Sequence, residues 1–148
     1  MTEITILIVV LVLAVLIGLL IRRREGRARP AAPASTNPER AGLLAAAGVT
    51  GTGPAVLHFS AEWCGPCAAV RRVVAGVTAD LAAEPHPPQD IEIDIDAEPA
   101  LARELNVLSL PTTFVFDAAG RERFRISGVP KAGDLRSALA PLTAADQG

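Results

Sequence analysis

The sequence is poor in cysteine, and its two cysteines, Cys64 and Cys67, are separated only by Gly65 and Pro66. No cysteine is left for a structural disulfide, so the cysteine count does not by itself indicate an oxidising or a reducing compartment. The net charge of -2 gives no sign of a nucleic-acid partner. With 148 residues, the chain has room for one domain and an extension.

The first long stretch of the chain has almost no polar residues. Residues 4–21 are apolar apart from Thr5 and Gly18. As a helix this run would span about 27 Å, close to the roughly 30 Å of a bilayer's hydrocarbon core. We therefore predict a transmembrane anchor over residues 1–24 that contacts membrane lipid through residues 4–21.

Basic residues are absent before this run and frequent after it. Met1, Thr2 and Glu3 precede it, whereas five arginines follow it: Arg22, Arg23, Arg24, Arg27 and Arg29. A secretory signal peptide has its charges on the other side, so the pattern favours an uncleaved anchor. The positive-inside rule then predicts a cytoplasmic catalytic domain. A cleaved segment or an extracytoplasmic domain remains the alternative.

The two cysteines are predicted to lie where a strand gives way to a helix. Ala55–Ser60 is typical of a buried strand, and a helix is expected from Cys67 onwards. There, unpaired backbone N–H groups and the helix dipole would stabilise a thiolate on Cys64. Cys64 is thus the candidate attacking sulfur. Cys67, one turn inside the helix and less exposed, would resolve a mixed disulfide, and Pro66 fits the first helical turn.

A bare pair of cysteines two residues apart also occurs in zinc half-sites, but the wider pattern here is more specific. The segment Trp63-Cys64-Gly65-Pro66-Cys67 follows a strand, and Leu110-Pro111-Thr112-Thr113-Phe114 lies further on. Together they resemble the thioredoxin family over about residues 55–142. The resemblance implies an α/β thioredoxin-like fold, with a mixed four-stranded sheet flanked by helices. This domain would follow the one N-terminal transmembrane helix that the apolar run predicts. It also implies a thiol–disulfide oxidoreductase that needs no bound cofactor and that receives electrons from a reductase or a membrane electron carrier.

The remaining elements follow from local patterns. Residues 25–37 read as a flexible linker, Asn37 as the cap of a short helix with Pro38 in its first turn, and residues 38–148 as the thioredoxin-like domain. The helix after the motif is expected to run to about Glu84. The strict alternation over 90–96 predicts a strand with its isoleucines on one face. Further expected elements are a helix over 98–106, strands over 112–116 and 121–127 joined by a turn over 117–120, and a helix over 131–142 broken late by Pro141. A first strand that often opens such domains is not visible.

The resemblance also assigns substrate-binding residues. Pro111 would be an ordinary edge or turn proline if the motif were absent, but it resembles the family's cis-proline beside the cysteines. By the same resemblance, the Leu110 backbone binds an extended substrate segment. The ring of Trp63 borders the site, and Gly128 lies near the same groove. Gly65 and Pro66 complete the substrate-binding set.

His58 departs from the family pattern, in which a buried aspartate in this strand helps to deprotonate the resolving cysteine. His58 is a candidate general base for Cys67, or alternatively a core histidine without a role in turnover. Because His58 stands in place of a buried anion, we expect the Cys64–Cys67 disulfide to be more oxidising than it would be with an aspartate at this position. Ala68 and Glu92 stand where members of the family often have lysine, and Ser60 stands where they often have tryptophan. We therefore expect this protein to act on a narrower set of partner proteins than a general thioredoxin does.

We therefore predict a membrane-anchored thiol–disulfide oxidoreductase that reduces protein disulfides through Cys64 and Cys67. The first alternative has the same chemistry outside the cytoplasm, in cytochrome or envelope protein maturation. The second is a non-enzymatic metal-binding or adaptor module that uses the cysteines with His58 or His86. Four good ligands are not evident for the second alternative.

Overall fold

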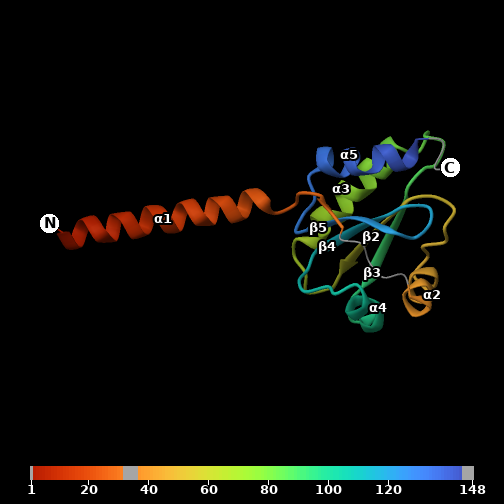
Figure 1. Cartoon of the computed structure of the whole chain (residues 1–148), viewed down its shortest axis with the longest axis horizontal. Coiled ribbons are helices and arrows are strands. Elements are labelled where there is room, and N and C mark those ends of the chain that lie inside the picture. The colour runs from red at the N-terminus through yellow and green to blue at the C-terminus, as the bar shows by residue number, and fades with distance from the viewer. Residues whose placement is uncertain (1, 32–36, 145–148) are drawn as a thin grey trace.

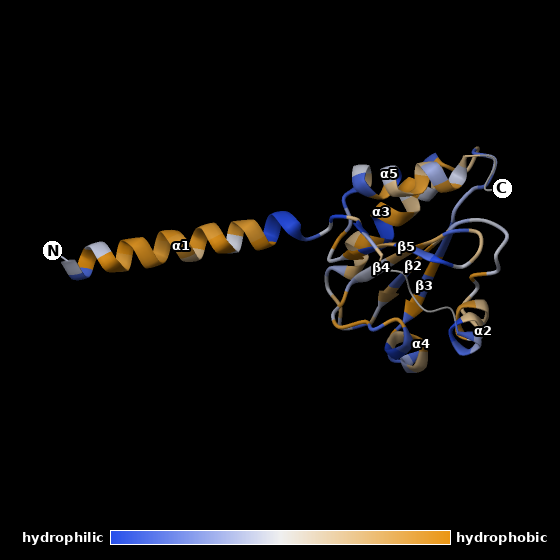
Figure 2. Ribbon diagram, in the orientation of Figure 1, coloured by the Kyte–Doolittle hydropathy of each residue, from blue (hydrophilic) through white to orange (hydrophobic). Residues whose placement is uncertain are grey.

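The computed structural model describes residues 2–31 and 37–144. Helix α1, Thr2–Arg24, projects away from the rest of the chain (Figure 1). Figure 2 shows that α1 is hydrophobic along most of its length and hydrophilic where it joins the domain. Among the described residues, α1 is the one helix long and apolar enough to cross a membrane, a property that signal sequences share.

The domain is built on a five-stranded sheet in the order β1-β5-β4-β2-β3. Its strands are β1 (Arg29–Pro30), β2 (Ala55–Ser60), β3 (Gln89–Asp94), β4 (Thr112–Phe116) and β5 (Glu122–Ser127). β2 and β3 pair in parallel, and the other neighbours are antiparallel. The sheet is mixed, as the sequence predicts, but it has five strands rather than four because β1 adds to the edge of β5.

Helices cover both faces of the sheet, α3 (Cys67–Asp80) and α5 (Ala132–Thr143) on one and α2 (Pro38–Ala46) and α4 (Pro99–Glu104) on the other (Figure 1). The alternation of β2 divides the core between them. Leu57 and Phe59 pack on the side of α2 and α4, whereas Val56 packs on the side of α3 and α5. All six residues of β2 are buried.

The ends of the helices confirm some of the predictions and contradict others. The Asn37 cap is confirmed, because its side chain accepts a hydrogen bond from the Arg40 N–H at 2.6 Å. The expected extension of α3 to Glu84 is wrong, because the helix ends at Asp80 and the chain continues in tight turns. Pro141 lies inside α5, which continues to Thr143.

Part of the predicted linker lies against the domain. β1 pairs with β5, and the Ala31 N–H donates to the Arg123 carbonyl at 2.9 Å. Residues 26–31 are therefore not a free tether, while residues 32–36 lie outside the described residues. Side-chain periodicity could not reveal this pairing, because backbone groups form it and the strand has only two residues.

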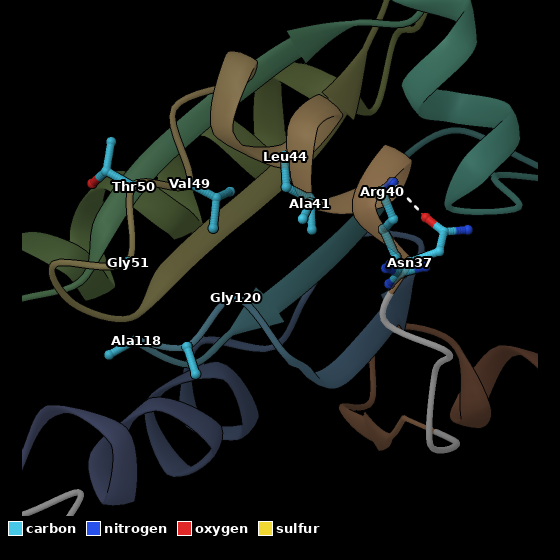
Figure 3. A pocket seen from close by; sticks show the side chains of 10 residues that line it. Asn37, Arg40, Ala41, Leu44, Val49, Thr50, Gly51, Ala118 and Gly120 are labelled. Carbon is cyan, nitrogen blue, oxygen red and sulfur yellow. Dashed lines mark hydrogen bonds between the residues drawn. The ribbon is translucent and has the colours of Figure 1, made fainter.

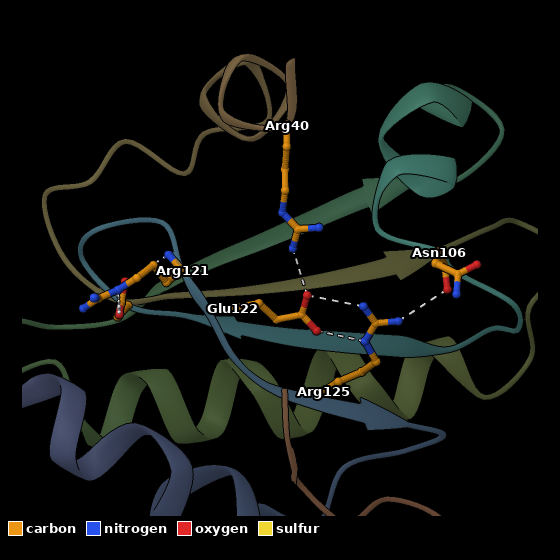
Figure 4. Close-up of polar contacts among 6 residues, drawn as sticks. Arg40, Asn106, Arg121, Glu122 and Arg125 are labelled. Carbon is orange, nitrogen blue, oxygen red and sulfur yellow. Dashed lines mark hydrogen bonds and ion pairs between the residues drawn. The ribbon is translucent and has the colours of Figure 1, made fainter. Parts of the chain in front are cut away.

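A buried carboxylate joins α2 to β5. The side chain of Glu122 is 4 % exposed and accepts hydrogen bonds from Arg40 and Arg125, each at 2.9 Å (Figure 4). Arg125 also donates to the Asn106 carbonyl and lies 4.6 Å from the ring centroid of Phe114. The cluster braces α2 and the loop after α4 against the sheet.

Replacing Arg40 by methionine should lower the free energy of unfolding by roughly 2 kcal/mol, because a buried carboxylate would keep only one of its two guanidinium partners. Urea unfolding of the full chain in a mild detergent measures the effect. Arg136→Met is the matched control, since Arg136 pairs with Asp80 on the surface and its loss should cost no more than about 0.5 kcal/mol. Equal losses in the two variants would contradict the bracing role of Arg40.

Candidate active site

The two cysteines are joined by a disulfide at the junction of β2 and α3. Their sulfur atoms are 2.03 Å apart and their Cα atoms 5.5 Å apart. The Cys67 N–H donates to the Cys64 carbonyl at 3.3 Å, which closes the turn between them. α3 begins at Cys67 with Pro66 as its N-cap. Cys67 is thus the first helical residue, not one turn inside the helix as expected.

The two sulfurs differ in their access to solvent. Cys64 is partly exposed, whereas Cys67 is 1 % exposed. The Cys67 sulfur lies 3.9 Å from the carbonyl oxygen of Phe59, the next-to-last residue of β2. An incoming disulfide or thiol can therefore reach Cys64 first.

A proline loop adjoins the cysteine end of the sheet. The Leu110–Pro111 peptide is cis, as the resemblance implies, and Pro111 is buried. Thr112, the next residue, pairs with Phe59 of β2 and with Ser127 of β5. These pairings place the proline loop and the end of β5 at the sheet end from which β2 leads into the cysteines.

Gly128, just after β5, is bonded to this loop. Its N–H donates to the Pro111 carbonyl at 2.9 Å. Gly128 has a positive φ of 83°, a conformation that glycine adopts without strain. The structure thus brings Gly128 and the proline together, as the resemblance implies.

Two large apolar side chains are exposed near these loops. Trp63 is 71 % exposed and its indole N–H donates to a carboxylate oxygen of Asp96 at 3.1 Å. Leu108, in the loop before the cis-proline, is 86 % exposed. Outside α1, these are the two exposed large hydrophobic residues in the described part of the domain. The sequence analysis missed Leu108, because no periodic pattern indicates exposure within a loop.

His58 is buried beside two carboxylates. It is 2 % exposed, and its Nε2 lies 3.1 Å from a carboxylate oxygen of Asp90. In β3, Glu92 is its cross-strand partner. The alternation of β2 places His58 on the same face as Val56, the face covered by α3, whose first residue is Cys67. The alternating pattern over 90–96 contained the signal for this contact, since it puts the acidic residues opposite the isoleucines.

Glu92 is held as a carboxylate. Burial would raise the pKa of Glu92, but hydrogen bonds from Ser60 and Arg71 and attraction to Arg71 and His58 together hold the pKa below its ordinary value of 4.5. The Arg71 Nε lies 2.7 Å from the Glu92 carboxylate and reaches it from α3. The face of β2 that leads to Cys67 thus carries one histidine with two carboxylates close by.

Two further features lie apart from the cysteines. His86, which only the metal-binding alternative would use, is an exposed loop residue. No group of three or more His, Cys, Asp or Glu residues able to hold a metal ion occurs in residues 2–31 and 37–144. A pocket between α2 and the β4–β5 turn is lined by Arg40, Leu44 and Gly120, among others (Figure 3). It adjoins the end of β4 opposite the cis-proline, away from the disulfide.

Comparison with known proteins decides the family. The thioredoxin family model matches residues 47–141, which include the cysteine pair and the cis-proline. The chain belongs to the thioredoxin family. The combination of this family with a cysteine pair at disulfide distance makes it a thiol–disulfide oxidoreductase.

Individual thioredoxins agree with this result. The thioredoxin of Mycolicibacterium smegmatis is 36% identical over 86 residues, covering 56% of this chain and 73% of that protein. The bifunctional thioredoxin reductase/thioredoxin of Mycobacterium leprae is 33% identical over 84 residues, 56% of this chain but only 18% of that protein. Oxidised mitochondrial thioredoxin 3 from Saccharomyces cerevisiae shares the fold with a TM-score of 0.54 and 22% identity, covering 64% of this chain and 83% of that one.

We expect the disulfide of this thioredoxin to be more oxidising than that of a His58→Asp variant. A carboxylate at position 58 would repel a thiolate nearby and so favour the disulfide over the dithiol. A tenfold change in the equilibrium constant would correspond to about 30 mV. Equilibration with glutathione measures the two reduction potentials.

His86→Asp is the matched control, because it makes the same substitution at the other histidine, which is exposed. Its potential should equal that of the unmodified protein. If the reduction potential of His58→Asp were as high as that of the unmodified protein, His58 would have no effect on the redox equilibrium of the cysteines.

Proposed function

We propose that this thioredoxin is a membrane-anchored reductase of protein disulfides, with Cys64 as the nucleophile and Cys67 as the resolving cysteine. The observation that carries the proposal is the unequal exposure of the two sulfurs beside a cis-proline. A buried partner is protected from side reactions but lies within bonding distance of the sulfur that substrates reach.

The reaction transfers two electrons to the substrate. The Cys64 thiolate attacks one sulfur of the substrate disulfide, forms a mixed disulfide and releases the other sulfur as a thiolate. The Cys67 thiolate then attacks the Cys64 sulfur and releases the second substrate thiolate. The protein finishes as the Cys64–Cys67 disulfide and the substrate as a dithiol.

The groups around the cysteines have distinct roles in this proposal. The Leu110 backbone binds an extended substrate segment, and Trp63, Gly65, Pro66 and the region of Pro111 and Gly128 form the surface against which it lies. His58 serves as general base for Cys67 on the face of the sheet that they share.

The length and composition of α1 support an anchor over residues 1–24, and the arginines that follow it support a cytoplasmic domain. The catalytic domain then comprises residues 38–148 together with the β1 segment that pairs with it. A thioredoxin reductase is the proposed electron donor, in keeping with the name of the bifunctional Mycobacterium leprae relative. A membrane electron carrier is the alternative.

Replacing Cys67 by serine should trap substrates in cells as mixed disulfides on Cys64, because the resolving thiolate is lost. Non-reducing electrophoresis of the full-length protein would show adducts that disappear on reduction. Cys64→Ser is the matched control and should give no adducts. Equal adducts in both variants, or none in either, would contradict these roles.

Labelling of the cysteines in whole cells tests the orientation. With the domain in the cytoplasm, we expect the two cysteines to be mostly reduced, to react with a permeant alkylating reagent and to be protected from an impermeant one. Thr2→Cys in a chain lacking Cys64 and Cys67 is the control, since α1 would carry it to the opposite side. Labelling of Cys64 by the impermeant reagent would instead place the domain outside the cytoplasm.

A further inference from the structure

The connection between α1 and the domain is very short. α1 ends at Arg24, and the Glu25 N–H still bonds to the Ile21 carbonyl at 3.2 Å. The next residue, Gly26, is buried and bonded to the domain at both of its backbone groups. Its N–H donates to the Ser127 carbonyl at 2.8 Å, and its carbonyl accepts from the Lys131 N–H at 3.1 Å. We call these two bonds the Gly26 clamp.

Only glycine fits at the clamp. Gly26 has a positive φ of 72°, and a Cβ at this position would lie 2.2 Å from the Val129 carbonyl oxygen. The segment 25–26 must therefore keep close backbone contact with the end of β5.

The clamp lies at the catalytic end of the sheet. Ser127, which accepts the Gly26 bond, pairs with Thr112 directly after the cis-proline. A Cβ on Gly128 would lie 3.7 Å from both the Glu25 Cβ and the Gly26 nitrogen. The residues that follow α1 thus adjoin the glycine that binds the Pro111 carbonyl. Figure 1 shows α1 leaving the domain on this side.

The spacing places this end of the domain at the membrane surface if α1 spans the bilayer. Ile21 is the last apolar residue of α1, and residues 22–24 add only about 4.5 Å of helix before Glu25. The headgroup layer on each side of a bilayer is itself roughly 5–7 Å thick. Gly26 would then lie at the outer edge of the headgroups.

The exposed apolar residues of the domain agree with this placement. Trp63 and Leu108 both belong to the loops at the catalytic end. Tryptophan is well suited to a surface that is part apolar and part wet, which is the character of a membrane interface. In this orientation these side chains would face the membrane surface or a partner that emerges from it.

We propose that the Gly26 clamp holds Cys64 beside the membrane, so that the preferred substrates are disulfides in the membrane-proximal segments of integral proteins of the same membrane. The inference rests on the proposed anchoring and reductase function, and it narrows the substrate class. A partner in the same membrane meets Cys64 at a high effective concentration, whereas a disulfide held far from the bilayer meets the domain from the wrong side.

Trp63 is the only tryptophan of the protein, so its fluorescence reports how close the catalytic end of the domain lies to the membrane, without any catalytic turnover. In vesicles that contain phosphatidylcholine spin-labelled at its headgroup, Trp63 fluorescence of the full-length protein should be quenched. A Gly/Ser insertion of about 12 residues between Arg24 and Glu25, with a reach of roughly 20 Å, should relieve the quenching. The same insertion after Gly148 is the control and should not. Unquenched Trp63 in the unmodified protein would overturn the placement.

The substrate preference is tested in proteoliposomes with the reduced full-length protein. One single-span peptide carries a two-cysteine disulfide loop directly after its span, and a second carries the same loop on a long Gly/Ser spacer. The near disulfide should be reduced at least about tenfold faster. Gly26→Ala and the insertion after Arg24 should both abolish the preference. Gly42→Ala is the matched control and should keep it, because a Cβ there meets nothing within 4 Å.

The outcomes separate the inference from the function on which it rests. Equal reduction of near and far disulfides by the unmodified protein would overturn the membrane-proximal preference and leave the reductase intact. If the protein reduced neither of the two peptides nor a soluble disulfide in detergent, the reductase function itself would be overturned.

Discussion

The burial of β2 is the constraint on which the rest of the structure depends. The strand is enclosed by β3 and β4 at its edges and by helices on both faces, so its six residues have no freedom to shift. A strand fixed in this way delivers Cys64 to one point at the end of the sheet. The cis-proline loop reaches the same point because β4 pairs with β2 from Thr112 onwards. Backbone pairing within the sheet therefore brings the cysteine turn and the cis-proline loop to the same end of the sheet.

The parts of this architecture that could be predicted from the sequence are those with a strong apolar pattern or a defined cap. The strands Ala55–Ser60 and Thr112–Phe116 were predicted to the residue, and Asn37 was identified as a cap. β1 could not be predicted, because two residues bonded through their backbone leave no periodic signature. The early end of α3 was also missed, since the prolines over 85–88 set only an outer limit to that helix.

The candidate site shows the same division. The cysteines and the cis-proline belong to short motifs whose residue types are dictated by their chemistry. The surroundings of His58 depend on the register between β2 and β3, which places His58 beside Asp90, 32 positions further along the chain. The exposure of Leu108 depends on the path of a loop. Such features arise from tertiary packing, and local sequence does not specify them.

β3 lies at the edge of the sheet, and an edge strand presents unpaired backbone groups to any neighbouring strand. Its acidic residues Asp90, Glu92 and Asp94 alternate with isoleucines, so they lie on one face. Two copies that met edge to edge through β3 would bring like charges side by side, which disfavours pairing. This row of carboxylates therefore limits the open edge of the sheet as a site for association between copies of the domain.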